Sequence, residues 1–86
     1  MNKILITGSS GFVGFNLSKF LLEKGWEVIG IDSMNDYYDI RLKINRRKIL
    51  NSFNHFSQFE FKLEEKNKLN EIFKKNDFKI IVHLGA

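Results

Sequence analysis

Three glycines near the amino terminus constrain the fold of this chain more than any other feature. Gly8, Gly11 and Gly14 stand between a short apolar run, residues 4–6, and a helical pattern that starts at Phe12. The run contains β-branched residues and is stopped by glycine, which predicts a strand buried on both faces. Glycine permits a tight exit from such a strand and lets a helix lie close to the sheet. The spacing therefore predicts a strand, a tight loop and a helix in succession.

Apolar patterns along the rest of the chain predict further strands and helices in alternation. The first helix is expected over residues 12–24, ended by Gly25, and its buried stripe is expected to be Val13, Leu17, Phe20 and Leu21. A second helix is expected over residues 38–53 and a third around residues 69–73. Strands are expected at residues 27–32, 56–61 and 78–84, the last of them buried. Gly30 in the second strand is expected to let another backbone come close.

Strands separated by helices of this length form βαβ units, which generate a parallel sheet with helices on its faces. We therefore expect an α/β fold, a partial Rossmann-type doubly wound parallel sheet of four strands in the order 3-2-1-4 with three helices. In this topology ligands bind at the carboxyl ends of the strands, where the strand order reverses.

Asp32 ends the second predicted strand, eighteen residues after Gly14. A carboxylate there can accept hydrogen bonds from the adenosine ribose of a dinucleotide, while main-chain amides and the helix N-terminus hold the diphosphate. The carboxylate would repel a 2′-phosphate, and residues 33–35 offer no Arg or Lys to receive one, so NAD is favoured over NADP. The alternative is that the glycines make only a turn and a close packing contact. A P-loop is excluded, because no Gly-Lys-Ser/Thr follows the loop.

Basic residues are concentrated in one segment of the chain. The formal net charge is +4, and five of the basic residues fall within residues 41–48, a segment without an acid. Such a cluster is compatible with nucleic-acid binding, but it is more often the solvated face of a helix. No aromatic stacking pattern or groove-reading motif accompanies it. We therefore expect no nucleic-acid partner.

The size and the remaining composition indicate one small domain of 86 residues. The chain has no cysteine, which excludes disulfides and thiolate metal sites and is compatible with a reducing cytoplasm. The glycine loop interrupts the first apolar run before a signal-peptide core is reached, and no stretch approaches membrane-spanning length. We expect a cytoplasmic protein with no metal and no membrane partner.

Residues 7–14, Thr-Gly-Ser-Ser-Gly-Phe-Val-Gly, resemble the Thr-Gly-x-x-Gly-Phe-x-Gly loop of extended short-chain dehydrogenases/reductases, the NAD-dependent sugar-nucleotide epimerases and dehydratases. Within that family, residues 30–39 are similar to the Gly-Ile-Asp-Asn-x-Asn-Asp-Tyr-Tyr-Asp stretch of UDP-glucuronate 4-epimerases. Residues 82–86 resemble the family's Val-x-His-Leu-Ala-Ala. The resemblance covers essentially the whole chain. It implies that residues 1–86 are the N-terminal part of an NAD(P)-binding Rossmann domain.

The resemblance also implies which residues hold the cofactor NAD. The glycine loop would line the diphosphate, the acid after the second strand would hold the adenosine ribose, and the end of the fourth strand would pass beside the nicotinamide half. The residues so implied are Gly8, Gly11, Phe12, Val13, Gly14, Asp32, Ser33, Leu84, Gly85 and Ala86.

Two positions depart from the family pattern. Ser33 stands where the family usually has Asn, which removes an amide from the edge of the ribose. After the third strand the family places an Asp before Leu to meet the adenine amino group, and alignment puts Lys62 there. Lysine cannot accept that hydrogen bond, whereas Glu64 or Glu65 could.

The family's reaction implies NAD as a transient hydride acceptor from a nucleotide sugar, with acid–base work done by a Tyr-x-x-x-Lys motif and a Ser or Thr. Neither Tyr37 nor Tyr38 has Lys four residues on, and His83 is interpreted as a hydrogen-bonded residue of a strand. We therefore expect no catalytic residue in this chain, with the catalytic and substrate-binding parts absent.

These inferences lead to two hypotheses about function. The first is the NAD-binding portion of a nucleotide-sugar epimerase similar to UDP-glucuronate 4-epimerase, incomplete for catalysis. The alternative is a non-catalytic remnant or interaction module that binds no cofactor. In either case the fourth strand would leave an exposed apolar edge, through which copies of the chain could self-associate.

Overall fold

Strands and helices alternate along the part of the chain that the structure describes, as the apolar patterns predict. The computed structural model describes residues 2–35 and 40–84. The elements, in chain order, are β1 (Lys3–Thr7), α1 (Phe12–Glu23), β2 (Glu27–Ile31), α2 (Ile40–Asn51), β3 (Phe56–Phe59), α3 (Lys66–Lys75) and β4 (Ile80–His83). Residues 38 and 39, where the second helix was expected to begin, lie outside the described residues. None of the helices in the described ranges is long and apolar enough to cross a membrane.

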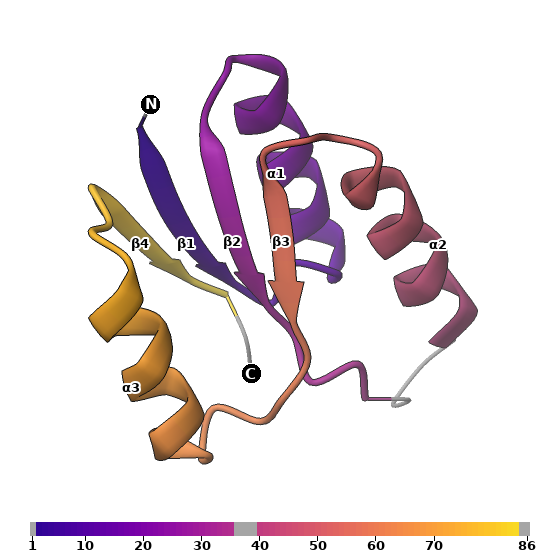
Figure 1. Cartoon of the computed structure of the whole chain (residues 1–86). Helices are drawn as coiled ribbons and strands as arrows, with labels where there is room; N and C mark the ends of the chain where they lie inside the picture. Colours follow the sequence, from indigo (N-terminus) through magenta and orange to yellow (C-terminus); the bar gives the residue numbers. More distant parts are fainter. Residues whose placement is uncertain (1, 36–39, 85–86) are drawn as a thin grey trace.

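The four strands form one parallel sheet in the order β3-β2-β1-β4, which confirms the predicted fold class and strand order. β1 lies at the centre, with Ile6 opposite Gly30 of β2 on one side and opposite Val82 of β4 on the other. Because the strands are parallel, their carboxyl ends meet at one edge of the sheet, and the loop that leads into α1 begins there (Figure 1).

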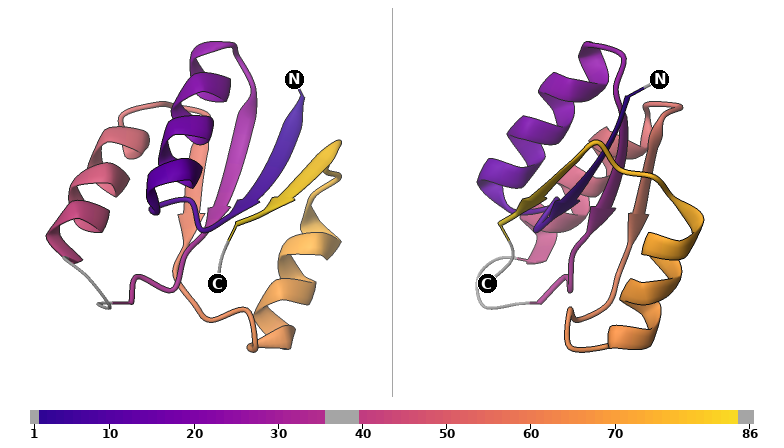
Figure 2. Two further views of the ribbon diagram at one scale, coloured as in Figure 1. Left: turned by 180° about the vertical axis from the view of Figure 1, so that it is seen from behind. Right: turned by 90° about the vertical axis from the view of Figure 1, so that its left-hand side faces the viewer.

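The sheet separates two apolar cores, one under each layer of helices. Figure 2 shows α1 and α2 against one face of the sheet and α3 against the other. Alternate residues of a strand point to opposite faces, so Ile4 and Ile6 belong to one core and Leu5 to the other. The core on the α1 side contains Ile4, Ile6, Leu22, Val28, Leu50 and Phe56. The core on the α3 side contains Leu5, Ile29, Ile31, Phe61 and Ile72.

The face that α1 buries differs from the predicted one. Gly14, Ser18 and Leu22 are its buried residues, whereas Val13 is 60% exposed and Phe20 is 55% exposed. The helix lies so close to the preceding loop that small residues occupy the contact. The prediction that Val13 and Phe20 are buried was therefore wrong, because apolar spacing was read without regard to side-chain size.

β4 is an edge strand, and its burial was predicted wrongly. Ile80 is 46% exposed and Ile81 is 52% exposed. Among the described residues β4 pairs only with β1, so its outer edge and parts of both of its faces are open. The separate prediction that the fourth strand leaves an exposed apolar edge agrees with this structure.

Candidate functional site

The loop between β1 and α1 is a tight corner fastened to the end of β2. Gly8 adopts a φ of 79°, in the left-handed region that favours glycine, and its N–H donates to the carbonyl of Ile31 over 2.7 Å. Gly11 N–H then donates to the carbonyl of Gly8 over 3.0 Å. Residues 8–14 therefore form the predicted strand-to-helix corner, held in place by the neighbouring strand.

The N-terminus of α1 offers main-chain donors that the protein does not cap with a side chain. The first hydrogen bond of the helix runs from Phe15 N–H to the carbonyl of Gly11 over 2.8 Å. The N–H groups of residues 12–14 therefore have no acceptor inside the helix. Gly11 provides no side-chain cap, and the first turn contains no acid. Such a helix end favours an anion, and this one fits a diphosphate group.

Asp32 is buried beside the loop, as the sequence predicts. It directly follows β2 and is 3% exposed. Its Oδ2 accepts a hydrogen bond from Ser10 N–H over 2.9 Å, and its Oδ1 accepts one from Met34 N–H over 2.8 Å. Ser33, the next residue, is exposed, and its Oγ accepts from Asn35 Nδ2 over 3.2 Å. The acid and the glycine loop are thus in direct contact.

Lys43 of α2 is a member of this site that sequence reasoning missed. Its Nζ lies 2.9 Å from Asp32 Oδ1, and the two side chains are 8% and 2% exposed. The expectation that residues 41–48 form only a solvated face is therefore wrong for Lys43. The signal was available in the helical spacing. Lys43 lies two turns before the buried Leu50, so both residues share the face that α2 turns to the sheet.

Two arginines of the same helix also contact neighbouring elements. Arg46 Nη1 donates to the carbonyl of Ser10 over 3.2 Å, and its guanidinium lies 5.8 Å from the centre of the Phe12 ring. Arg47 Nη1 pairs with Glu60 Oε2 over 2.5 Å. These contacts give the basic segment a structural role within the chain.

Gln58 of β3 links the third strand to the glycine loop. Its Oε1 accepts hydrogen bonds from Ser9 Oγ over 2.9 Å and from Ser10 Oγ over 3.1 Å. A Cβ added at Gly30 would lie 2.4 Å from Ser9 Oγ. The close neighbour of Gly30 is therefore the side chain of Ser9 and not the backbone that the sequence led us to expect. The pattern of β3 indicated a strand and gave no sign of the contacts of Gln58.

The end of β4 is tied to the end of β1. Leu84 N–H donates to the carbonyl of Thr7 over 3.1 Å and lies 3.0 Å from Thr7 Oγ1. His83 Nδ1 lies 2.7 Å from the same hydroxyl. His83 is thus hydrogen-bonded as expected, but it is exposed. Leu84 comes to the edge of the sheet where the glycine loop begins, whereas Gly85 and Ala86 lie outside the described residues.

Of the two acids considered for adenine recognition, Glu65 makes its side-chain contacts at the start of α3. Glu65 precedes the helix, and its Oε2 accepts from Lys62 N–H over 3.1 Å. Its Oε1 lies 3.2 Å from Lys68 Nζ. Hydrogen bonds from Lys68 and then from the Lys62 amide lower the pKa of Glu65. The residue that directly follows β3 is Glu60. The alignment put Lys62, not Glu60, at the position where the family has the Asp that meets the adenine.

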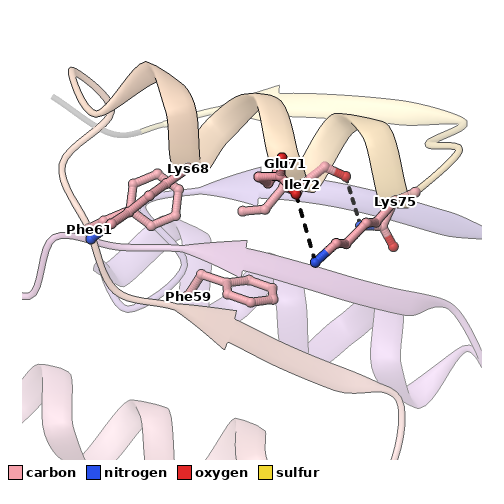
Figure 3. Close-up of a pocket in the computed structure, with 7 residues that line it drawn as sticks. Phe59, Phe61, Lys68, Glu71, Ile72 and Lys75 are labelled. Atoms are coloured by element: carbon pink, nitrogen blue, oxygen red, sulfur yellow. Dashed lines mark hydrogen bonds and ion pairs between the residues drawn. The ribbon is translucent and has the colours of Figure 1, made fainter.

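A separate apolar cavity of about 250 Å³ lies under α3 (Figure 3). Phe59, Phe61 and Ile72 contribute to its wall, and the Glu71–Lys75 ion pair of 3.9 Å crosses its rim. It lies on the face of the sheet opposite α1, away from the glycine loop. No group of three potential metal ligands occurs among residues 2–35 and 40–84.

Comparison with known proteins gives matches over almost the whole chain. The chain is 43% identical over 84 residues to protein CapI of Staphylococcus aureus, with 98% of this chain and 25% of that protein covered. It is 34% identical over 86 residues to a UDP-glucuronate 4-epimerase of Thermodesulfobacterium geofontis, with 100% and 27% covered. The chain thus spans about a quarter of the length of these relatives.

Solved structures show the same likeness. The crystal structure of UDP-glucuronic acid 4-epimerase from Bacillus cereus in complex with NAD superposes with a TM-score of 0.83 at 28% sequence identity, covering 95% of this chain and 26% of that one. The predicted resemblance to nucleotide-sugar epimerases and dehydratases is confirmed. The family model described as GDP-mannose 4,6-dehydratase matches residues 5–86. Because this match includes nearly every residue, the chain belongs to the GDP-mannose 4,6-dehydratase family.

Proposed function

We propose that this chain binds NAD at the carboxyl edge of its sheet, as the cofactor-binding portion of a nucleotide-sugar epimerase similar to UDP-glucuronate 4-epimerase. One observation carries the proposal: Asp32 Oδ2 accepts a hydrogen bond from Ser10 N–H over 2.9 Å. This contact brings the acid that suits a ribose against the loop that suits a diphosphate. The relatives add support, since the B. cereus enzyme was crystallised with NAD.

Each part of the site has a separate task in this proposal. The uncapped N–H groups at the start of α1 would hold the diphosphate, with Phe12 and Val13 exposed beside it. Asp32 would hold the adenosine ribose, and Leu84 would lie toward the nicotinamide half. Bound NAD would supply a hydride acceptor. The chain's own contribution is to bind and orient the cofactor.

Calorimetric titration of the 86-residue chain with NAD tests the proposal. We expect saturable binding, which Asp32→Ala abolishes. The milder Asp32→Asn keeps the side-chain volume but loses the charge. We expect it to weaken binding by roughly 10- to 100-fold, the usual effect of losing hydrogen bonds to a charged group.

The matched control is Asp77→Asn, which removes an exposed acid from the segment between α3 and β4. This variant should bind NAD like the unaltered chain. Far-ultraviolet circular dichroism of each variant separates a lost contact from a lost fold. Absence of binding to a folded unaltered chain at millimolar NAD would contradict the proposal.

The reaction proposed for the complete enzyme, 4-epimerisation of UDP-glucuronate, requires groups that this chain does not contain. The positions four residues after Tyr37 and Tyr38 are Arg41 and Leu42, so neither tyrosine belongs to a Tyr-x-x-x-Lys motif. We therefore predict that the 86-residue chain with saturating NAD does not turn over UDP-glucuronate. Detection of UDP-galacturonate above an enzyme-free control would refute this prediction. Its place in the cytoplasm is proposed from the lack of cysteine.

A second candidate function is an interaction module that binds no cofactor. The exposure of Ile80 and Ile81 on the open edge of β4 favours it. The NAD titration separates the two candidates, because an interaction module would show no heat of NAD binding while remaining folded.

A further inference from the structure

The face of the sheet under α3 carries an aromatic ring that the helix does not cover. Phe59 stands beside Ile31 in the register of β3 and β2, and residues paired in register point to the same face of a sheet. Ile31 belongs to the core under α3, whereas Phe59 belongs to neither core and is 44% exposed. An apolar ring in this position gains free energy when a ligand removes it from water.

The space between Phe59 and α3 is the apolar cavity of about 250 Å³ described above (Figure 3). Lys68, Glu71 and Lys75 of α3 follow one another at intervals of three and four residues, so they lie on one side of the helix. This side borders the cavity, and the three charged side chains stand at its rim. The cavity is therefore apolar inside and charged at its mouth.

The interior of the cavity suits an apolar ring system. Phe61 and Ile72, which are 8% and 5% exposed, form its walls together with Phe59. The amide of Asn76 at the wall has both of its polar ends occupied. Its Oδ1 accepts from Lys3 Nζ over 2.9 Å, and its Nδ2 donates to the Ile72 carbonyl over 2.8 Å. An apolar cavity of about 150 Å³ takes up benzene, so this volume leaves room for two fused rings.

The rim carries more positive than negative charge, because two of the lining residues are lysines and one is an acid. Lys68 pairs with Glu65 over 3.2 Å and lies 5.9 Å from the centre of the Phe61 ring. Lys75 lies 3.9 Å from Glu71, and these two side chains are 75% and 59% exposed. An ion pair so exposed contributes little to stability. The ammonium of Lys75 can therefore turn to the carboxylate of a ligand at small cost.

We propose that the cavity under α3 binds a small aromatic carboxylate with two fused rings. The rings would lie among Phe59, Phe61 and Ile72, in the offset or edge-to-face contacts that aromatic pairs prefer, and the carboxylate would meet Lys75. The site lies on the face of the sheet opposite α1 (Figure 2). It is thus separate from the glycine loop and goes beyond the proposed binding of NAD.

Titration of the isotope-labelled 86-residue chain with 2-naphthoate, followed by nuclear magnetic resonance, tests this proposal. We expect saturable shifts of the amide signals of Phe59, Phe61 and Ile72. The dissociation constant should be roughly 0.1–1 mM, the range that a ligand of this size reaches in a small apolar site. The neutral 2-naphthamide should bind about two- to fivefold more weakly, because it lacks the charge that Lys75 meets.

Variants of the rim test the part played by charge. Lys75→Met should weaken the binding of 2-naphthoate about two- to fivefold and leave that of 2-naphthamide unchanged. Glu71→Gln removes the acid that competes for Lys75 and should tighten the binding of 2-naphthoate by a similar factor. Lys74→Met is the matched control, because it removes an exposed charge from the adjacent position, which does not line the cavity. It should change the affinity for neither ligand.

A variant of the wall tests the part played by the rings. Phe59→Ala removes one aromatic contact and should weaken the binding of both ligands about tenfold. Because Phe59 belongs to neither core, the chain should remain folded, which circular dichroism checks. Phe20→Ala is the matched control, since it truncates an exposed phenylalanine of α1, on the other face of the sheet. It should leave both affinities unchanged.

The unaltered chain by itself decides the proposal, even if a variant unfolds. The absence of saturable shifts of the cavity residues at several millimolar 2-naphthoate would overturn it, and so would binding of 2-naphthamide as tight as that of 2-naphthoate. Shifts of the same residues when the chain alone is diluted would mean that a second copy covers the cavity, which also contradicts the proposal. None of these measurements contains NAD, so their outcome is independent of the proposed function.

Discussion

Gly14 has no room for a side chain, whereas Gly11, in the same loop, nearly does. A Cβ at Gly14 would lie 2.0 Å from the carbonyl oxygen of Gly8 and 2.8 Å from its carbonyl carbon. At Gly11 the closest atom would be the same oxygen, at 3.3 Å. Both glycines belong to one motif, yet only Gly14 is required by the contact between the helix and the loop. The motif therefore has two roles, close packing at Gly14 and room for a ligand at Gly11. Substituting each glycine by itself can separate these roles.

Gly14→Ala should consequently destabilise the fold much more than Gly11→Ala. The backbone of Gly8 cannot move aside cheaply, because its N–H is hydrogen-bonded to Ile31. Overpacking of this kind costs about 1–3 kcal/mol, and we expect the upper end of that range. Gly11 is the N-cap residue of α1, and alanine is less favourable than glycine at this position. Gly11→Ala should therefore lower the free energy of unfolding by at most about 1 kcal/mol. Urea unfolding followed by circular dichroism measures both values, and equal costs would contradict the packing argument.

At the scale of the element, α1 buries a hydroxyl for which it has no partner. Ser18 is fully buried, and its Oγ makes no hydrogen bond to any described residue. Ser18 lies on the buried face of α1 together with Gly14 and Leu22. Alanine is equally small, forms helices more readily and has no polar atom to desolvate.

Ser18→Ala should therefore stabilise the chain, by about 1 kcal/mol. The control is the same substitution at Ser52, whose exposed hydroxyl donates to the carbonyl of Ile49 over 2.6 Å. Ser52→Ala removes a hydrogen bond that is made and should give no gain. Both variants are compared with the unaltered chain by urea unfolding. A loss of stability in Ser18→Ala would mean that the hydroxyl has a partner after all.

The start of α3 depends on the charge of one carboxylate. The Lys68 ammonium and the Lys62 amide hold the pKa of Glu65 below its ordinary value of 4.5. The ionised form is therefore favoured in the folded state, so its stabilising contacts are present above the ordinary pKa and are lost as the pH falls through the lowered pKa.

Replacing Lys68 by Met should raise the pKa of Glu65 toward its ordinary value. Lys68 makes the contact with the largest effect on this carboxyl. Lys66→Met is a control that removes an exposed charge one residue from Glu65 without removing that contact. Carboxyl titration by nuclear magnetic resonance reads the pKa directly. An unchanged titration of Glu65 in Lys68→Met would show that the ion pair does not form in solution.

The order of the elements was predictable from the sequence, and the buried face of α1 was not. Residues 4–6 and the three glycines allow few arrangements, and right-handed βαβ crossovers allow fewer still. Apolar spacing, however, carries no information on how close a helix lies to its neighbours, and Gly14 is buried because α1 lies directly against the backbone of Gly8. Local periodicity determines which elements form, whereas tertiary distance determines which residues they bury.

The same limit explains the outcome for the candidate site. Asp32 could be placed beside the loop because both follow directly from strand ends. The partnership of Asp32 with Lys43 depends on the path of the chain between β2 and α2, for which no sequence periodicity exists. Gln58 was missed for a similar reason, because its contacts cross from β3 to a loop forty-nine residues earlier. Polar contacts between elements require the three-dimensional arrangement.

At the scale of the whole molecule, the sheet has two edge strands, β3 and β4, each paired on one side only among the described residues. β3 is accompanied by α2 and carries a glutamine and two aromatic residues, while β4 has the sequence Ile-Ile-Val-His with no charge and no proline. Natural edge strands are usually protected by charged side chains, proline or a covering element. The register places Ile81 beside Leu5, on the face that α3 covers, and 52% of Ile81 is nevertheless exposed. The edge is thus both unpaired among the described residues and apolar.

We therefore predict that the 86-residue chain self-associates through β4 at tens of micromolar. Pairing of two β4 edges would satisfy their main-chain groups and cover Ile80 and Ile81. Ile81→Lys adds a charge to the edge and should return the chain to a monomer in sedimentation velocity. Phe20→Lys is the control, since it removes an equally exposed apolar residue from α1 and should leave the association intact. Slow amide exchange in β4 of the unaltered chain, lost in Ile81→Lys, would locate the contact at the strand. A monomeric unaltered chain, or an equal effect of both substitutions, would mean that this edge does not recruit a second copy.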